Sequence, residues 1–145
     1  MPVKTVKVTS TLDNTFRIES DVRGHKVVVD QPEAAGGANG GPTPLEYLFV
    51  SIAGCIGSMA RIMAMQKRLP VRGMTISVEG DVNTDGLLGK ATEDRIGFTA
   101  LRVTANIDAD MTLEEKQAFL AAVDSRCPVS ENLEHGVPIA FDVVG

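Results

Sequence analysis

The stretch TPLEYLFVSIAGCIGSMARIMAMQK, residues 43–67, decides the fold of this chain. Thr43, Pro44 and Glu46 fit the N-cap, the first-turn proline and the third position of a capping box. Apolar residues then occupy nearly every face of a helix until its last turn, and Leu69-Pro70 ends it. We therefore predict a helix from Thr43 to Lys67, or one residue further, that is buried all round.

A second subunit is the simplest cover for such a helix, because one small domain rarely surrounds about 24 helical residues by itself. Small residues would let another backbone approach closely: Gly54, Gly57, Ser58 and Ala60. Charged and polar residues interrupt the apolar run, whereas a transmembrane helix needs about 20 predominantly apolar residues. We therefore expect a homodimer that is soluble and cytoplasmic, with no membrane association.

Strands are predicted on both sides of the helix. Before it, β-branched and alternating residues indicate an antiparallel meander, with a turn at 21–24 and strands at 3–9, 15–20 and 25–30. A flexible glycine-rich loop, residues 33–42, leads into the helix.

After the helix, alternation indicates strands at 74–78, 101–107 and 139–143, with a long hairpin tip at 81–95. A capping box at 112–115 starts a second helix, which Cys127-Pro128 ends. The order predicts an α+β fold with largely antiparallel sheets packed on a long buried central helix.

Composition restricts the function classes. At 145 residues the chain fits a single domain over residues 1–145. It carries 19 acidic and 14 basic residues, so no basic surplus exists for nucleic-acid binding. The sequence holds no phosphate loop, dinucleotide fingerprint or Gly-x-Ser-x-Gly motif. His25 and His135 have no local ligand partner, so we expect no metal and no cofactor.

The two cysteines are the strongest candidates for chemistry, although each alone favours an inert thiol. Glycines near Cys55 cost about 1 kcal/mol each in a helix, which indicates that the space around the sulfur is needed. Because 72 positions (127 − 55) separate the cysteines, a redox pair would be a tertiary contact. In that case a Cys55 thiolate would attack a peroxide oxygen, and its sulfenic acid would condense with Cys127 to a disulfide.

A thiolate needs a cationic neighbour. Arg17 and Arg23 of the meander are candidates, whereas Arg61 lies six positions from Cys55 on a largely different helix face. Glu46 lies nine positions before Cys55, about 180° around the helix, which favours capping over a place beside the sulfur. The alternative for Glu46 is to hold such an arginine in place.

Two motifs carry a resemblance to a known family. Gly40-Gly41-Pro42-Thr43-Pro44-Leu45-Glu46-Tyr47-Leu48, followed by Ala53-Gly54-Cys55, resembles the start of the central helix in the OsmC/Ohr family of osmotically inducible and organic hydroperoxide resistance proteins. Cys127-Pro128-Val129-Ser130 resembles the family's second cysteine motif, and the order of elements is similar over essentially the whole chain.

The resemblance implies an intertwined homodimer and a thiol peroxidase for organic hydroperoxides. It implies that Cys55 is the peroxidatic cysteine, that Cys127 is the resolving cysteine and that Arg17 holds the thiolate. In the family a glutamate that pairs with this arginine directly follows the proline. Here Leu45 stands in that place, and the acid comes one position later, at Glu46.

We therefore expect an OsmC-like thiol peroxidase whose disulfide is reduced by an external thiol or dithiol. Its site residues would be Cys55, Cys127, Arg17 and Glu46. Its apolar pocket would be lined by Leu48, Phe49 and Ile52 or their neighbours. Two alternatives stay open: a redox sensor that oxidises without turnover, and a dimeric small-molecule binding module with spectator thiols.

Overall fold

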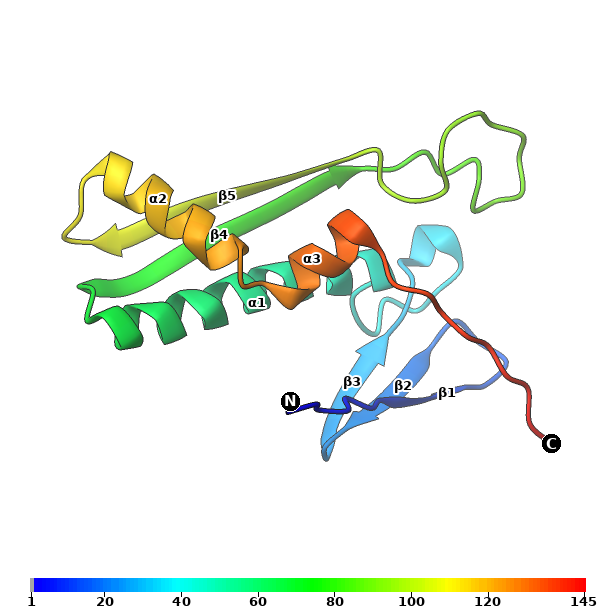
Figure 1. Ribbon diagram of the computed structural model, residues 1–145. Coiled ribbons are helices and arrows are strands. Elements are labelled where there is room, and N and C mark those ends of the chain that lie inside the picture. The colour runs from blue at the N-terminus through cyan, green and yellow to red at the C-terminus, as the bar shows by residue number, and fades with distance from the viewer. Residues whose placement is uncertain (1) are drawn as a thin grey trace. The chain divides into compact units, whose positions relative to one another are not determined.

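The computed structural model describes residues 2–145 and has the element order β1–β2–β3–η1–α1–β4–β5–α2–α3 (Figure 1). Both sheets are antiparallel, and three α-helices accompany them, so the predicted α+β class is confirmed. The chain divides into an N-terminal unit that ends at Leu48 and a C-terminal unit, Phe49–Gly145.

The N-terminal unit is built on a three-stranded meander. Strands β1 (Thr9–Leu12), β2 (Ile18–Val22) and β3 (His25–Val29) pair in that order. Arg23 and Gly24 join β2 to β3 with φ angles of 52° and 86°, as a two-residue hairpin turn of the favoured hand requires. The predicted meander and its turn are therefore confirmed.

The boundaries of the first two strands differ from the prediction. Residues 2–8 form no strand, because β2 offers them no partner: Thr9 already lies opposite Asp21, and β2 turns two residues later. A run of β-branched residues has a high β-propensity, but it forms a strand only beside another strand. The second strand starts late because Asp13 Oδ1 accepts a hydrogen bond from the Thr15 N–H at 2.8 Å, which makes residues 13–15 a turn.

The glycine-rich loop before the helix is compact. It contains a short 3₁₀ helix, η1 (Glu33–Ala35), and closes through backbone hydrogen bonds such as Asn39 N–H to the Gln31 carbonyl at 3.0 Å. A Cβ on Gly37 would lie 2.1 Å from the Gln31 oxygen, and one on Gly41 would lie 2.2 Å from the Val28 oxygen. These glycines allow close backbone approach, rather than the flexibility that composition indicated.

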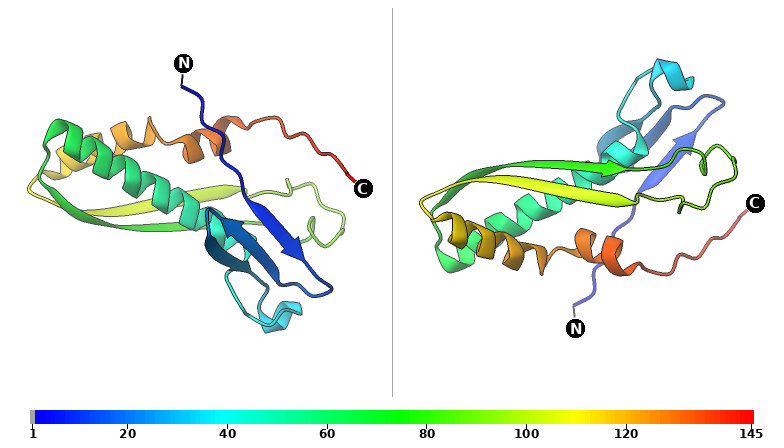
Figure 2. Two further views of the ribbon diagram at one scale, coloured as in Figure 1. Left: turned by 90° about the horizontal axis from the view of Figure 1, so that it is seen from below. Right: turned by 90° about the horizontal axis from the view of Figure 1, so that it is seen from above.

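In the C-terminal unit, α1 (Pro44–Lys67) lies along a two-stranded hairpin of β4 (Val71–Asp81) and β5 (Ala100–Ala109) (Figures 1 and 2). Gly57 marks the contact, because a Cβ there would lie 3.7 Å from Ile76 Cδ1. Helix α2 (Leu113–Asp124) starts with the predicted capping box and adds Phe119 and Val123 to the core. The buried apolar core of this unit consists of Ile52, Ile56, Ala60, Met63, Ala64, Val71, Ile107, Ala109, Phe119, Val123 and Cys127.

The long helix is confirmed, but within this chain only one of its faces is buried. Val50, Ile62 and Met65 are 61%, 43% and 71% exposed. By length and composition α1 is long and apolar enough to cross a membrane, with 28% of its most apolar window buried inside the described chain. The core helix of a soluble protein meets the same criterion.

The C-terminal end differs from the prediction in two respects. A third helix, α3 (Pro128–His135), follows α2 directly. The strand predicted at 139–143 is absent from the described chain, and Ile139, Phe141 and Val143 are 72%, 88% and 100% exposed. No strand among residues 2–145 pairs with this segment, so its alternating side chains find no sheet to join.

Candidate functional site

The two cysteines meet in the C-terminal unit. Cys55 lies midway along α1 and is half-buried, whereas Cys127 is only 2% exposed. The Cys127 side chain and the backbone N–H of Val129 are the neighbours that act on the Cys55 thiol. Both thiols are free in the described chain, and residues far apart in the sequence are neighbours here.

Cys127 is the N-cap of α3. Its backbone is extended, and its sulfur accepts a hydrogen bond from the Ser130 N–H at 3.4 Å. Pro128 is the first residue of the helix, a position where its missing N–H costs nothing. Helix α2 already ends at Asp124, so the dipeptide that was predicted to end it begins the next helix instead. Glu131 in the first turn and Gly136 after the last residue are the signals by which the sequence could have revealed this helix.

The surroundings of Cys55 raise its pKa above the ordinary value of 9.0. Burial is the largest cause, and the hydrogen bond to the Cys127 sulfur comes next, because it favours the protonated thiol. The Val129 N–H acts in the opposite direction and lowers the pKa. At neutral pH Cys55 is therefore a thiol, and a reactive thiolate needs further stabilisation of its negative charge.

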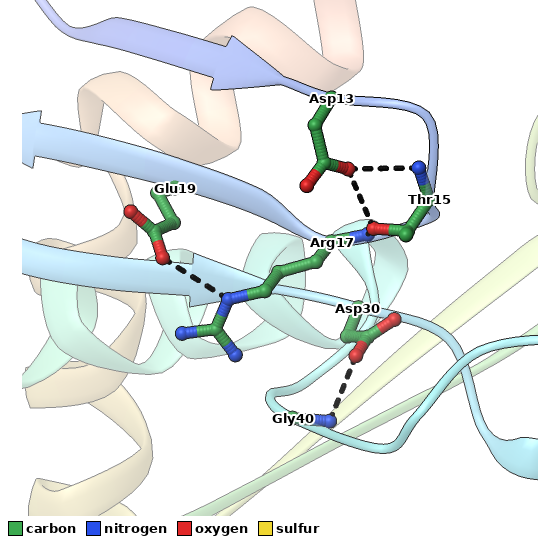
Figure 3. Close-up of polar contacts among 6 residues, drawn as sticks. All are labelled: Asp13, Thr15, Arg17, Glu19, Asp30 and Gly40. Carbon is green, nitrogen blue, oxygen red and sulfur yellow. Dashed lines mark hydrogen bonds and ion pairs between the residues drawn. The ribbon is translucent and has the colours of Figure 1, made fainter.

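Arg17 lies just before β2 in the N-terminal unit, where an ion pair with Glu19 holds it (Figure 3). Its Nε donates to Glu19 Oε1 at 3.1 Å. Its Nη1 passes Gly40 so closely that a Cβ on Gly40 would lie 2.8 Å away. Because Arg17 and Cys55 belong to different units, the role of Arg17 toward the thiolate stays a prediction.

Asp30 is a buried carboxylate that sequence reasoning missed. It is 1% exposed and accepts hydrogen bonds from the N–H groups of Gln31 at 2.7 Å and Gly40 at 2.9 Å. These bonds, with the charge of Arg17 as a smaller cause, hold its pKa below the ordinary 3.8. Asp30 therefore fixes the glycine-rich loop around its carboxylate, with the Arg17 guanidinium beside it (Figure 3). An aspartate directly before a glycine-rich segment is the one sequence signal for it.

Glu46 caps α1. The Thr43 N–H donates to Glu46 Oε1 at 2.8 Å, and the Glu46 N–H donates to Thr43 Oγ1 at 3.3 Å. These contacts with Thr43 lower the pKa of the Glu46 carboxyl. The ion pair that the structure gives Arg17 is with Glu19. Capping, which the helix geometry favoured, is therefore observed, and a catalytic role for Glu46 stays a prediction.

Arg61 and Arg23 have structural roles. Arg61 donates to the backbone carbonyls of Val71 at 2.9 Å and Arg72 at 3.2 Å, which ties α1 to β4. Arg23 is a hairpin-turn residue. A Cβ on Gly54 would meet nothing within 4 Å, so no described part of this chain needs the space beside it.

A cavity of about 610 Å³ lies in the C-terminal unit between α1, β5, α2 and α3, and neither cysteine is part of its wall. Its wall is mainly apolar: Ile52, Ile56, Leu101, Val103, Leu120 and Leu133. Of the predicted pocket residues, Ile52 is in this wall, whereas Phe49 stacks on Phe98 with ring centroids 4.9 Å apart. Leu48 belongs to the N-terminal unit. Within residues 2–145 no group of three or more His, Cys, Asp or Glu is placed to hold a metal ion.

Fold and site together define a two-cysteine α+β protein in which the central helix and the last helix each carry one thiol. The sequence profile of the family described as OsmC-like protein matches residues 36–142, and the chain belongs to this family. No curated protein matches the sequence at a significant level.

Solved structures show the same fold. The OsmC-like protein of Mycoplasma pneumoniae is 21% identical, with a TM-score of 0.79 over 91% of this chain and 89% of that chain. An organic hydroperoxide resistance protein OsmC from Legionella pneumophila is 19% identical, with a TM-score of 0.70 over 94% and 93%. An organic hydroperoxide resistance protein from Elizabethkingia anophelis is 22% identical, with a TM-score of 0.68 over 92% and 91%.

Proposed function

We propose that this protein is a cytoplasmic, homodimeric thiol peroxidase that reduces organic hydroperoxides. The Cys55 thiolate attacks the terminal oxygen of ROOH. An S–O bond forms, the O–O bond breaks, and the alkoxide takes up a proton and leaves as ROH. The Cys127 thiolate then attacks the Cys55 sulfenic acid, so that an S–S bond forms and hydroxide leaves as water after taking up a proton. An external thiol or dithiol reduces the disulfide and is itself oxidised.

The direct contact of the two thiols carries this proposal. A disulfide requires Cα atoms about 4.4–6.8 Å apart, and two thiols that already act on each other need little movement to bond. The solved relatives described as organic hydroperoxide resistance proteins support the choice of substrate class. The apolar cavity beside α1, with Ile52 and Ile56 in its wall, favours an alkyl group over water.

Arg17 is the proposed source of positive charge for the thiolate. Its guanidinium is oriented by Glu19 at 3.1 Å and lies beside Asp30, so this chain uses other acids where the family uses a glutamate directly after the proline. Glu46 contributes indirectly, because it fixes the first turn of α1.

The exposed side of α1 supports the homodimer. Apolar and small residues form a stripe, spaced three or four positions apart and defined by Val50, Gly54, Ser58, Ile62 and Met65. Such a stripe suits the close approach of a second helix, since large exposed apolar patches mark association surfaces.

A redox sensor is the second candidate, and the raised pKa of Cys55 favours it. A thiol that is mostly protonated at neutral pH reacts slowly and suits a single oxidation better than rapid turnover. Only turnover separates the sensor from the peroxidase, because both form the same disulfide.

The test mixes reduced protein with cumene hydroperoxide or hydrogen peroxide and follows disulfide formation and dithiol-dependent turnover. We expect faster consumption of the organic peroxide, no activity in Cys55→Ser, and arrest at the sulfenic acid in Cys127→Ser. Arg17→Met should slow the first step, whereas Arg23→Met, in the hairpin turn, is the matched control and should not.

Wild-type rates in Cys55→Ser would overturn the peroxidase. One disulfide per chain without sustained turnover would identify the sensor. Thiols that stay reduced, in a protein that retains a small molecule on purification, would favour the binding module.

A further inference from the structure

We propose that Asp30 is a positioning residue that, together with Gly40, places the guanidinium of Arg17. As an account of how Cys55 becomes reactive, this inference rests on the proposed peroxidase function. As an account of where Arg17 lies, it stands on contacts within the N-terminal unit alone.

The Asp30 carboxylate is a fixed point in this unit. It is 1% exposed, and each of its oxygens has a backbone donor of its own. Oδ1 accepts from the Gln31 N–H at 2.7 Å, and Oδ2 accepts from the Gly40 N–H at 2.9 Å. Hydrogen bonds to the charged form favour that form, so the carboxylate stays ionised at neutral pH. Two backbone donors therefore hold one buried negative charge in one orientation.

The missing side chain at Gly40 brings Arg17 to this charge. A Cβ on Gly40 would lie 2.8 Å from Arg17 Nη1 and 3.1 Å from Asp30 Oδ2. Both charged groups therefore border the same small space, and the guanidinium lies beside the carboxylate (Figure 3). A larger residue at position 40 would occupy the place that Arg17 Nη1 needs.

The ion pair with Glu19 does not fix the guanidinium by itself. Arg17 Nε donates to Glu19 Oε1 at 3.1 Å, and the two side chains are 44% and 66% exposed. An exposed ion pair contributes little, because water screens it and two long side chains lose freedom. Asp30 acts from the buried side, where screening is weaker. We therefore assign to Asp30 the direction in which the remaining N–H donors of Arg17 point.

The sign of the effect on Cys55 distinguishes positioning from other roles of Asp30. If Asp30 positions Arg17, Asp30→Asn displaces the guanidinium and slows the alkylation of Cys55. If Asp30 acted on the thiol only through its own charge, removing that charge would favour the thiolate and speed alkylation. If Asp30 only maintained the fold, a looser chain would expose the half-buried thiol and also speed alkylation.

The first experiment measures the alkylation of Cys55 by iodoacetamide at neutral pH, in a Cys127→Ser background. We expect Asp30→Asn, Gly40→Ala and Arg17→Met each to slow it about ten-fold, which corresponds to a rise of about one unit in the Cys55 pKa. Combining either of the first two with Arg17→Met should slow it no further. A further ten-fold loss in the combined variants would overturn the inference.

Gly40→Ala keeps the charge of Asp30 and covers the case in which Asp30→Asn does not fold. The atom that its methyl group meets at 2.8 Å is the far end of the flexible Arg17 side chain, which can move aside. Asp21→Asn is the matched control and should leave alkylation unchanged. Asp21 likewise accepts a backbone N–H, that of Gly24 at 3.0 Å, but its ion pair is with Lys26.

A second readout observes Arg17 itself, in protein labelled with ¹⁵N-arginine. The Nε–Hε signal of Arg17 is assigned by its loss in Arg17→Met. We expect this signal to shift in Asp30→Asn and Gly40→Ala and to keep its place in Asp21→Asn. An unshifted signal in the first two variants would overturn the inference. A shifted signal, with alkylation that Arg17→Met leaves unchanged, would support the positioning of Arg17 and refute its proposed role at Cys55.

Discussion

Two substitutions of Gly54 test the stability of the chain and its self-association independently. Alanine in place of glycine inside a helix stabilises a protein by about 1 kcal/mol, provided that nothing obstructs the new methyl group. A Cβ on Gly54 would meet nothing within 4 Å, so the isolated chain should gain this amount in full. For a chain of this size that gain corresponds to a rise in Tm of about 3 °C.

The same position lies in the exposed stripe on α1 that we propose as the dimer contact. A leucine at residue 54 would hold two helices apart, so we expect Gly54→Leu to weaken dimerisation at least ten-fold. Urea unfolding at low protein concentration measures the stability, and sedimentation equilibrium measures the association. Gly57→Ala is the matched control, because its Cβ would make an ordinary 3.7 Å contact with Ile76 inside the chain. It should give the same gain in stability and leave association unchanged.

Two results would refute this reasoning. If Gly54→Ala lowers the stability of the monomer, the space beside Gly54 is filled in a way that the structure of the single chain does not show. If Gly54→Leu associates as tightly as the wild type, the dimer forms elsewhere or does not form.

Three further predictions concern the fold. The pKa of Asp30 is depressed in the folded chain, so its carboxylate stabilises the fold fully above pH 3.8 and loses this effect as the pH falls below 3.8. The difference in unfolding free energy between wild type and Asp30→Asn should therefore shrink in acid. Gly37→Ala places a methyl group 2.1 Å from the Gln31 oxygen, so it should lower the free energy of unfolding by about 1–3 kcal/mol, measured by chemical denaturation. An unchanged denaturation midpoint would contradict the compact loop. Phe119→Ala should lower the free energy of unfolding by about 3–5 kcal/mol, because the Phe119 side chain is 5% exposed. Leu113→Ala is the control: Leu113 is 72% exposed, so the change should stay within about 0.5 kcal/mol. Equal losses in the two variants would show that the core is misplaced.

Sequence patterns predicted those elements whose partners lie close by in the chain. The capping box at Thr112, the hairpin turn at Arg23-Gly24 and the long α1 are local signals, and the structure has all three. The strand predicted at 3–9 rested on β-branched content, and the strand predicted at 139–143 rested on side-chain alternation. Such patterns show that the side chains of a segment are compatible with a sheet. A strand forms only where the backbone of a neighbouring strand is available for hydrogen bonding.

The candidate site was predictable in its residue types and not in its local chemistry. The two cysteines could be predicted because each lies in a sequence motif and because the order of the predicted helices and strands resembles the family's. The N-cap role of Cys127 was hidden because Cys-Pro also marks the end of a helix. The role of the buried Asp30 could not be predicted, because its hydrogen-bond partners are backbone N–H groups. Every residue except proline carries such a group, so the sequence pattern does not indicate which ones will bind the carboxylate.

The compact loop at residues 31–42 has a practical consequence for engineering. A glycine-rich connection between a sheet and a helix is where an epitope tag, a fusion junction or a protease site is ordinarily placed. Here Asp30 and the neighbouring carbonyls hold the backbone of the loop, so an insert would disturb the lead into α1. The segment at 82–99 suits that purpose better, because it joins β4 to β5 outside both strands and exposes Leu87 and Leu88 at 58% and 62%. An insert placed there would leave the dithiol and the loop intact.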